Sequence, residues 1–387
     1  MTNKKFKLAA MSLATAVAVS TVGPSASAVT YYLGDGSVTV DKDDTRGAYS
    51  YQGEDGSEKH RTYVNEDKAD NGVIYVKDGN APTEEVPSTT DNSNNSTEVP
   101  TPTDNATQST DASGNNTENS STSETTTGNT ITVMEDVKKT EKTDGTEGND
   151  VKIVVDSVNA DTSETGKSTV TIGEGADVDL TVKDSNLTTG GHGIDIGVNL
   201  EGKDENKGAN VDLTLDNTNI NLTEKDNTAG IVARDHSKVE VTLKGENTID
   251  GKEALEDAAQ EAEAAKKEGK SSPNRNVEGI RVGGENAGDD SSGKGASLTI
   301  KGDETSDQGS LNIDHTSTGM VISNGSDVTL TDNADVDIKH TEAGSSTQGG
   351  RGIVQRGDLT VEDKSSLTID TCLLYTSPSP RDTERSR

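Results

Sequence analysis

The chain lacks many of the residues that build small cores and binding sites. Its 387 residues include one Cys, no Trp and one Phe. The Cys is Cys372, so the 371 residues before it offer no disulfide, no nucleophilic thiol and no Cys-based metal site. The Phe is Phe6, and residues 130–371 contain no aromatic side chain at all. Ligand pockets are commonly lined by aromatic side chains, and sugar rings stack on them, so the absence weighs against an efficient glycan cleft there.

Positive charge is also scarce. The chain has 36 Lys and Arg against 69 Asp and Glu, a formal net charge of −33. That balance argues against nucleic acid or an anionic membrane surface as a partner, because both carry negative charge. Only 27% of the residues are hydrophobic, which by itself is typical of disorder. A folded chain is still expected, because the apolar residues are clustered and patterned.

The longest apolar run lies at the N-terminus and indicates export. Lys4, Lys5 and Lys7 precede a mostly aliphatic run over residues 8–22, and residues 26–28 read Ala-Ser-Ala. This order predicts a signal peptide over residues 1–28, cleaved before Val29. The run is too short for a spanning helix, which needs about 20 predominantly apolar residues. We therefore expect no membrane-spanning segment in this sequence.

The last residues look unlike the rest of the chain. Residues 372–382 read CLLYTSPSPRD, which back-translates to a transposase-type sequencing adapter. We therefore interpret residues 372–387 as a sequencing artefact and expect the natural chain to continue past Thr371, where an anchor would lie.

Two segments precede the main body. Residues 29–78 contain short strand patterns at residues 30–33, 37–40 and 73–76, which predict a capping coil or a small β-subdomain. Residues 79–128 carry eight acids and four Pro but no Lys or Arg, and most of the remainder is Ser, Thr, Asn and Gly. Like charges repel and little can be buried, so a disordered linker or loop is predicted.

The main body, residues 130–371, repeats a strand pattern with period 2. Taking one aliphatic residue per unit as a marker gives intervals of 33, 28, 57, 30 and 31 residues; the markers are Leu180, Leu213, Val241, Leu298, Val328 and Leu359. A fixed period near 30 is typical of a stacked array, with one insertion. Each unit also has a second marker, an aliphatic residue after Gly, at Gly193, Gly230, Gly279, Gly319 and Gly352.

The units predict an all-β solenoid. A third alternating piece, such as residues 219–222 or 310–313, lies between the two markers, so each unit offers about three short strands. Alternation sends Leu, Val and Ile to one face and Thr, Asp and Lys to the other. Stacking equivalent strands in parallel joins the apolar faces into one narrow core. Only one Pro, Pro273, interrupts residues 130–371, and it lies outside the repeated strands.

The long interval contains a predicted helix. Residues 253–267 are dense in Ala and Glu, end in Lys266 and Lys267, and are followed by Gly269. Leu255 is its only large apolar residue, so we expect an insertion over about residues 252–270 that projects from the solenoid.

On these repeats, residues 130–371 resemble the right-handed parallel β-helix proteins, the pectate-lyase-like superfamily. They are nearer to its bacterial surface members, which are adhesin-like or carbohydrate-binding-domain-like, than to its enzymes. The resemblance rests on repeat shape and brings no catalytic motif, and a shared fold does not fix function.

Three features are candidates for chemistry, and each has a plainer interpretation. Asp179, Asp212 and Glu240 share one position and could form an acidic ladder, or simply be solvated. Residues 190–198 fit most of a Ca²⁺-binding nonapeptide, but as a single copy they favour a turn leading into a strand. The five histidines are dispersed without ligand spacing; they are His60, His192, His236, His315 and His340.

These observations assign no catalytic, cofactor-binding or metal-binding residue. The first hypothesis is a secreted or cell-surface solenoid with a structural or adhesive, non-catalytic role, whose partner is an extracellular glycan or a host or cell-surface protein. The second is a carbohydrate-active protein, either a polysaccharide lyase or a glycan-binding module. Acids gathered with Lys or Arg on one solenoid face would favour the second hypothesis, and a random scatter would favour the first.

The charge balance generates one prediction. No cofactor is expected, but millimolar Ca²⁺ should raise the melting temperature of the protein by relieving repulsion among its carboxylates. Circular dichroism melts in Ca²⁺ and in EDTA measure this effect. Identical melting temperatures in the two conditions would contradict it.

Overall fold

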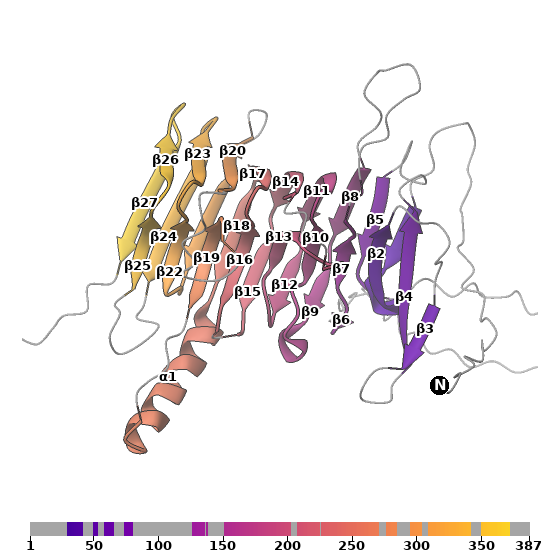
Figure 1. The fold of residues 1–387 in the computed structure, drawn as a ribbon, viewed down its shortest axis with the longest axis horizontal. Helices are drawn as coiled ribbons and strands as arrows, with labels where there is room; N and C mark the ends of the chain where they lie inside the picture. The colour runs from indigo at the N-terminus through magenta and orange to yellow at the C-terminus, as the bar shows by residue number, and fades with distance from the viewer. Residues whose placement is uncertain are drawn as a thin grey trace, which may run out of the picture.

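The computed structural model describes residues 29–41, 49–52, 58–65, 73–79, 126–135, 137, 151–202, 207–224, 226–270, 276–284, 295–303, 309–341 and 350–371. Over these residues the chain is all-β, with strands in three stacked sheets and one α-helix (Figure 1). The predicted signal peptide, the suspected adapter and residues 80–125 of the predicted linker lie outside the described residues.

Sheet A has nine strands, paired in parallel in chain order. They are β1 (Val29–Tyr32), β5 (Val73–Lys77), β8 (Val151–Asp156), β11 (Asp177–Lys183), β14 (Asn210–Asp216), β17 (Lys238–Lys244), β20 (Ser297–Gly302), β23 (Asp327–Thr331) and β26 (Asp358–Val361). Sheet C has eight: β6 (Thr126–Thr127), β9 (Asn159–Asp161), β12 (Asn186–Thr189), β15 (Asn219–Leu222), β18 (Glu246–Asp250), β21 (Ser310–Asp314), β24 (Asp335–Thr341) and β27 (Ser366–Thr371).

Sheet B has ten strands and contains the one antiparallel pair of the three sheets, β3 with β4. Its strands are β3 (Tyr49–Gln52), β4 (Glu58–Asn65), β2 (Ser37–Asp41), β7 (Ile131–Val133), β10 (Val170–Gly173), β13 (Ile194–Val198), β16 (Thr228–Ala233), β19 (Val277–Val282), β22 (Thr318–Ile322) and β25 (Arg351–Gln355).

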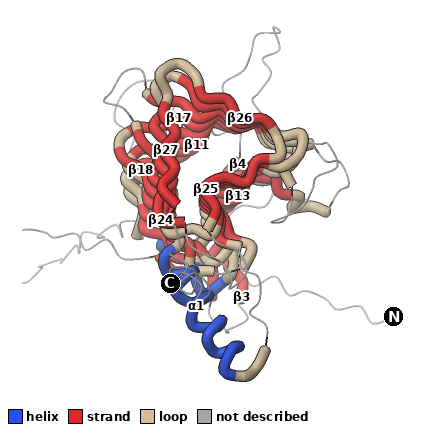
Figure 2. The backbone as a smooth tube through the Cα atoms, turned by 90° about the vertical axis from the view of Figure 1, so that its left-hand side faces the viewer, coloured by secondary structure: helices blue, strands red, loops and turns tan. Residues whose placement is uncertain are grey.

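From β8 onward the chain visits the sheets in a fixed order. It passes through sheet A, then C, then B, and returns to A one strand further along. We call one such passage a coil. Figure 2 looks along the stack and shows the three sheets surrounding a common interior. The architecture is that of stacked coils, consistent with a β-solenoid.

The N-terminal segment belongs to the same stack. The strands expected at residues 30–33, 37–40 and 73–76 are found as β1, β2 and β5. Because β5 pairs with β8 in sheet A and β2 pairs with β7 in sheet B, the segment extends the sheets in the manner of a capping coil. The β3–β4 hairpin, which pairs onto β2 at the end of sheet B, was not predicted from the sequence.

The repeat unit was located correctly, but the last three markers, from Leu298 onward, are offset by two residues from the first three. Leu180, Leu213 and Val241 are level with one another in sheet A, whereas Val241 is level with Ile300 and not with Leu298. A shift of two residues keeps every side chain on the same face of a strand. Alternation of apolar and polar residues therefore cannot distinguish the two alignments, and hydrogen-bond register decides between them.

The core is one continuous apolar cluster that extends from Leu33 to Ile338. Sheet A strands show the expected alternation, as in β14, where Val211, Leu213 and Leu215 are buried and the residues between them are not. Full burial of one such side chain stabilises the fold by roughly 1.5–3 kcal/mol. The inside of the stack is therefore a column of aliphatic residues contributed by every coil.

The corner between sheets A and C needs a left-handed backbone. Ser157, Asp184, Asn217 and Gly245 have φ between 47° and 59° at this corner in four successive coils. Asp and Asn tolerate this conformation and Gly adopts it freely. The corner thus explains why Asn, Asp and Gly recur between the first and third strand patterns of each unit.

At the second marker, glycine is required by close packing and not by a positive φ. A Cβ on Gly279 would lie 2.3 Å from Cγ2 of Ile313 and 2.4 Å from the carbonyl oxygen of Gly319. Gly193, Gly230 and Gly319 meet Ile220, Ile249 and Ile338 in the same way. Each of these four glycines is thus covered by an Ile of sheet C, which brings the two sheets into close contact.

Helix α1 (Lys252–Lys267) forms the insertion. Its bounds match the predicted ones, with Gly269 in the left-handed region just beyond its end. Only Ala254, Leu255 and Ala258 of the helix are buried, and it packs beside β15 at its root and projects from the stack (Figures 1 and 2).

The last described coil is less well covered than the others. Val361 and Ile369 are 44% and 45% exposed, whereas their neighbours in register, Leu330 and Ile338, are fully buried. Strands β25, β26 and β27 stand at the ends of their sheets in the described residues, so their outer edges have no strand paired to them there.

The Gly–Ile contact predicts that Gly279→Ala destabilises the protein. The added methyl must displace Ile313 or the Gly319 carbonyl, so we expect a loss of about 1–3 kcal/mol in the free energy of unfolding. Urea unfolding followed by circular dichroism measures this loss. Thr299→Ala, on the outward face of β20, is the matched control and should change stability by less than about 0.5 kcal/mol. Equal midpoints for the two variants would show that the contact does not constrain the fold.

Candidate functional site

The acidic ladder predicted on sheet A exists. Asp179 is level with Asp212, and Asp212 is level with Glu240, on the outward side of β11, β14 and β17. Basic residues stand at both ends: Lys152 lies 3.6 Å from Asp179, and Lys301 lies 2.6 Å from Glu240. Asp212 in the middle is exposed. The ladder is a solvated surface with partial charge compensation, as the plainer interpretation held.

A second charged column on sheet A alternates in sign. Lys77, Asp156, Lys183, Asp216 and Lys244 follow one another in register. Asp156 lies 3.5 Å from Lys77 and 3.2 Å from Lys183. Burial raises the pKa of Asp156, but the Ser157 hydroxyl and the Lys183 ammonium outweigh it and hold the pKa below its ordinary value. Opposite charges on neighbouring strands favour this register over a slipped one.

Sheet B differs from the expectation that one face of each strand is solvated. Every residue of β16 and β19 is buried, so both faces of these strands are covered. The polar side chains there include Glu278 and Arg281 on β19, and Asp195 on β13 is buried as well. The alternation of apolar and polar residues could not reveal this, because it separates the two faces without saying whether the polar one is open to water.

Arg281 and Glu278 form a buried ion pair. Nε of Arg281 donates to Oε2 of Glu278 over 2.6 Å, and Nη2 donates to Oδ1 of Asn227 over 3.0 Å. Arg281 is 0% exposed. Burial raises the pKa of Glu278, and the guanidinium opposes that shift. Removing either partner would leave a buried charge without its counter-ion, which is strongly destabilising.

A second ion pair and a histidine complete this group of charges. Arg234, which follows β16, donates two hydrogen bonds to the carboxylate of Asp195, at 2.8 and 2.9 Å. Nδ1 of His192 accepts the backbone N–H of Ala229 over 3.1 Å, which places the ring proton of the neutral form on Nε2. Burial lowers the pKa of His192 from 6.5 to about 4; Arg281 and Arg234 add to the shift, and Asp195 opposes it.

Residues 190–198 form the turn and strand that the plainer interpretation predicted. Residues 190–193 turn the chain out of β12, and β13 begins at Ile194. Gly190 and Gly191 pass so close to the backbone at residues 162–163 and 166–168 that a Cβ on either would lie under 3 Å from it. Close backbone contact accounts for these glycines without a Ca²⁺ ion.

The corner between sheets A and C carries an open hollow of about 490 Å³. Its lining is mostly polar and consists of Ser157, Val158, Asn159, Asp184, Ser185, Asn186, Asn217 and Asn219. Some of these groups bond to one another: Nδ2 of Asn186 donates to Asn159 over 3.1 Å, and Nδ2 of Asn217 donates to Asp184 over 3.3 Å. The hollow is therefore a surface between repeated turns whose polar groups partly satisfy each other.

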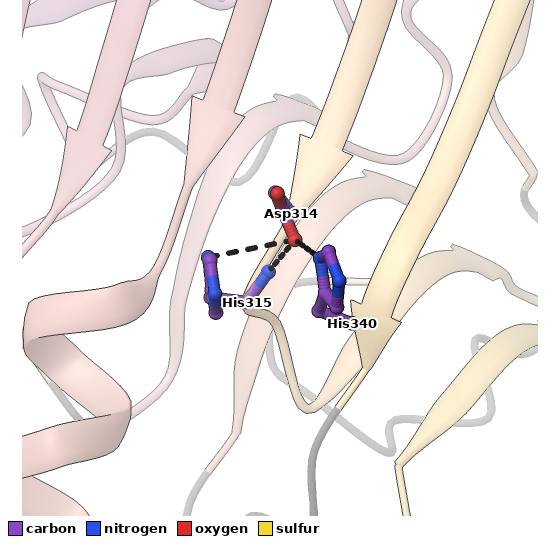
Figure 3. A group of neighbouring side chains, drawn as sticks. All are labelled: Asp314, His315 and His340. Carbon is purple, nitrogen blue, oxygen red and sulfur yellow. Dashed lines mark hydrogen bonds and ion pairs between the residues drawn. The ribbon is translucent and has the colours of Figure 1, made fainter. Parts of the chain in front are cut away.

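The stacking of coils brings together His315 and His340, which appeared dispersed in the sequence. His315 follows β21, and His340 lies in β24, so they stand on successive coils (Figure 3). Their rings stack with centroids 5.3 Å apart and an interplanar angle of 14°. Oδ1 of Asp314 lies 2.8 Å from Nδ1 of His340 and 3.4 Å from Nδ1 of His315. Asp250, level with Asp314 on β18, adds a carboxylate oxygen 3.1 Å from Nδ1 of His315.

We call Asp250, Asp314, His315 and His340 the corner cluster. A signal for it was present in the sequence: residues 313–316 read Ile-Asp-His-Thr and residues 338–341 read Ile-Lys-His-Thr, one coil apart. The unit is shorter here than the average interval of the markers, so the repeat as first aligned did not show that the two motifs coincide. Of the remaining histidines, His192 and His236 lie on other turns, and the side chain of His60 is outside the described residues.

Comparisons with known proteins found no relative. No family model matches the chain, and neither the curated proteins nor the solved structures contain a match. Within the described residues, no helix has the length and apolar character needed to cross a bilayer.

The buried His192 predicts a specific pH dependence. Its pKa is about 4 in the folded protein and 6.5 ordinarily, so protonation favours the unfolded state. The stability that comes from neutral His192 is fully present above pH 6.5 and is lost as the pH falls towards 4. At that lower limit the loss is about 3 kcal/mol.

The measurement is the free energy of unfolding from pH 7 to 4 for the wild type and for His192→Asn, whose amide oxygen can still accept the Ala229 N–H. The wild type should lose more stability than the variant over this range. His236→Asn, at an exposed turn, is the control and should follow the wild type. Parallel curves for all three proteins would mean that His192 is not buried in its neutral form.

Proposed function

We propose that the chain is an exported, cell-surface solenoid of the right-handed parallel β-helix type, with a structural or adhesive role and no catalysis. Its partner would be an extracellular glycan or a host or cell-surface protein. The observation that carries the proposal is the unbroken stack of in-register coils from β5 to β27, built around one apolar cluster. A stack of this kind is a stiff scaffold that holds a surface away from its point of attachment.

The charges of sheet B support a non-catalytic role. Catalytic acids and bases must reach a substrate in a cleft, in geometry suited to proton transfer. Here Glu278 is held by Arg281 and Asp195 by Arg234, and all four side chains are mostly or fully buried. Charged groups that are buried and paired in this way favour a role in the stability of the fold over a role in catalysis.

The carbohydrate-active alternative has one specific observation in its favour. Two carboxylates and two guanidiniums gather on one face, beside His192, instead of being scattered over the solenoid. A polysaccharide lyase needs acids with a basic residue nearby, so this group is where such an activity would lie. The absence of aromatic side chains from residues 130–371 and the burial of the charges count against it.

Export and lack of turnover can be tested on one protein. The full chain is expressed in a bacterial host, the mature protein is recovered, and its N-terminus is determined by mass spectrometry. The recovered protein is then incubated with polyuronates and neutral polysaccharides. We expect the protein outside the cytoplasm, beginning at Val29, bound to cells or glycans and releasing no product. Lys4→Glu/Lys5→Glu/Lys7→Glu is the matched control, and it should stay inside the cell.

Two outcomes would contradict the proposal. Retention of the wild-type protein in the cytoplasm would contradict the proposed export to the cell surface. Polyuronate cleavage that disappears in Arg234→Lys, with the fold retained by circular dichroism, would establish the carbohydrate-active alternative.

A further inference from the structure

We propose that the corner cluster is a binding site for one divalent transition-metal cation of the Zn²⁺ type, with His315, His340 and Asp314 as ligands, an open position for water, and Asp250 as a carboxylate partner of His315. This site goes beyond the proposed function and does not depend on it. It is distinct from the charged group of sheet B, because it lies at the C-terminal ends of sheet C strands, next to the first residues of α1.

The distances suit a single ion. A tetrahedral Zn²⁺ with bonds of about 2.0–2.1 Å holds its ligand atoms about 3.3 Å apart. In the corner cluster the carboxylate oxygen of Asp314 lies 2.8 and 3.4 Å from the two Nδ1 atoms, and that of Asp250 lies 3.1 Å from Nδ1 of His315. One donor atom from each of Asp314, His315 and His340 can be chosen so that all lie within 4.8 Å of one another. Because the two rings are nearly parallel here, at least one must rotate for both imidazoles to bond the same ion.

The donor types select the class of metal. Imidazole nitrogen suits Zn²⁺, Cu²⁺ and Ni²⁺, whereas Ca²⁺ and Mg²⁺ prefer oxygen ligands throughout. Two imidazoles with one or two carboxylates therefore favour a transition metal. This separates the corner cluster from the many carboxylates elsewhere on the surface, which would attract Ca²⁺ without a defined geometry.

The one cation next to the imidazoles in the chain is engaged elsewhere. The ammonium of Lys339, next to His340 in the chain, bonds to Asp337 over 2.7 Å and to Asn312 over 3.1 Å, so it is held away from the imidazoles. Figure 3 shows both rings turned towards the carboxylate of Asp314. The His340 side chain is 55% exposed, which gives a metal ion and a water ligand access from solvent.

The site would link three coils. Its ligands stand at the end of β21 and in β24, and Asp250, at the end of the neighbouring strand β18, contacts His315. Oδ1 of Asp250 also accepts the backbone N–H of Lys252, the first residue of α1, over 2.9 Å. A bound ion would therefore connect the base of the projecting helix to the two following coils, and stabilise them by mass action.

The test uses Zn²⁺ alone, titrated into the full chain by calorimetry in millimolar Ca²⁺, so that exposed carboxylates are already occupied. We expect one Zn²⁺ per chain. His315→Asn and His340→Asn should each weaken its binding by at least 10–100-fold, about the loss seen when even an outer partner of a ligand is removed. Asn suits both positions because it tolerates a positive φ, and φ is 46° at His315 and 45° at His340.

His236→Asn is the matched control, since His236 also has a positive φ, 64°, but lies on a different turn. It should bind Zn²⁺ as the wild type does. Cu²⁺ in place of Zn²⁺ should give an electron paramagnetic resonance spectrum with coupling to two nitrogens, reduced to one in either cluster variant. The proposal is overturned if the wild type binds no Zn²⁺, if His315→Asn/His340→Asn binds it equally well, or if the Cu²⁺ spectrum shows oxygen ligands only.

Discussion

The architecture depends on a close contact between two columns, the glycines that open the sheet B strands and the isoleucines of sheet C. At Gly230, Gly279 and Gly319 there is no room for even a methyl group, because Ile249, Ile313 and Ile338 fill it. The contact recurs in four successive coils, so it limits how far apart the two sheets can lie over that part of the stack. This distance determines the cross-section of each coil. The cross-section in turn positions the aliphatic interior, the left-handed turns and the charge columns.

Much of this could be predicted from the sequence, because it arises from local patterns that repeat. Alternation identified three strands per unit, and the composition of residues 253–267 identified the helix. The Gly-aliphatic marker proved to be level in the five units that carry it. These features depend on chemistry within a few residues of the chain. Repetition then multiplies each weak signal.

What could not be predicted depends on register and on covered surfaces. The alignment of Leu298 was wrong by two residues because a two-residue shift leaves the faces of a strand unchanged. The corner cluster was missed because only the register between β21 and β24 in sheet C shows that His315 lies beside His340. The buried pair of Glu278 and Arg281 was missed because alternation marks them as polar and outward, whereas their burial depends on which parts of the chain cover sheet B.

Helix α1 leaves the stack after Asp250, and the chain re-enters it at Val277, level with Thr228 of the preceding coil. The ladders on both sides continue as though the excursion were absent. A corner of the coil can therefore admit an inserted segment, provided that its two ends return to neighbouring positions in the ladders. Such a scaffold can acquire or exchange appendages by simple insertion, and what it displays can change while the framework that carries it stays the same.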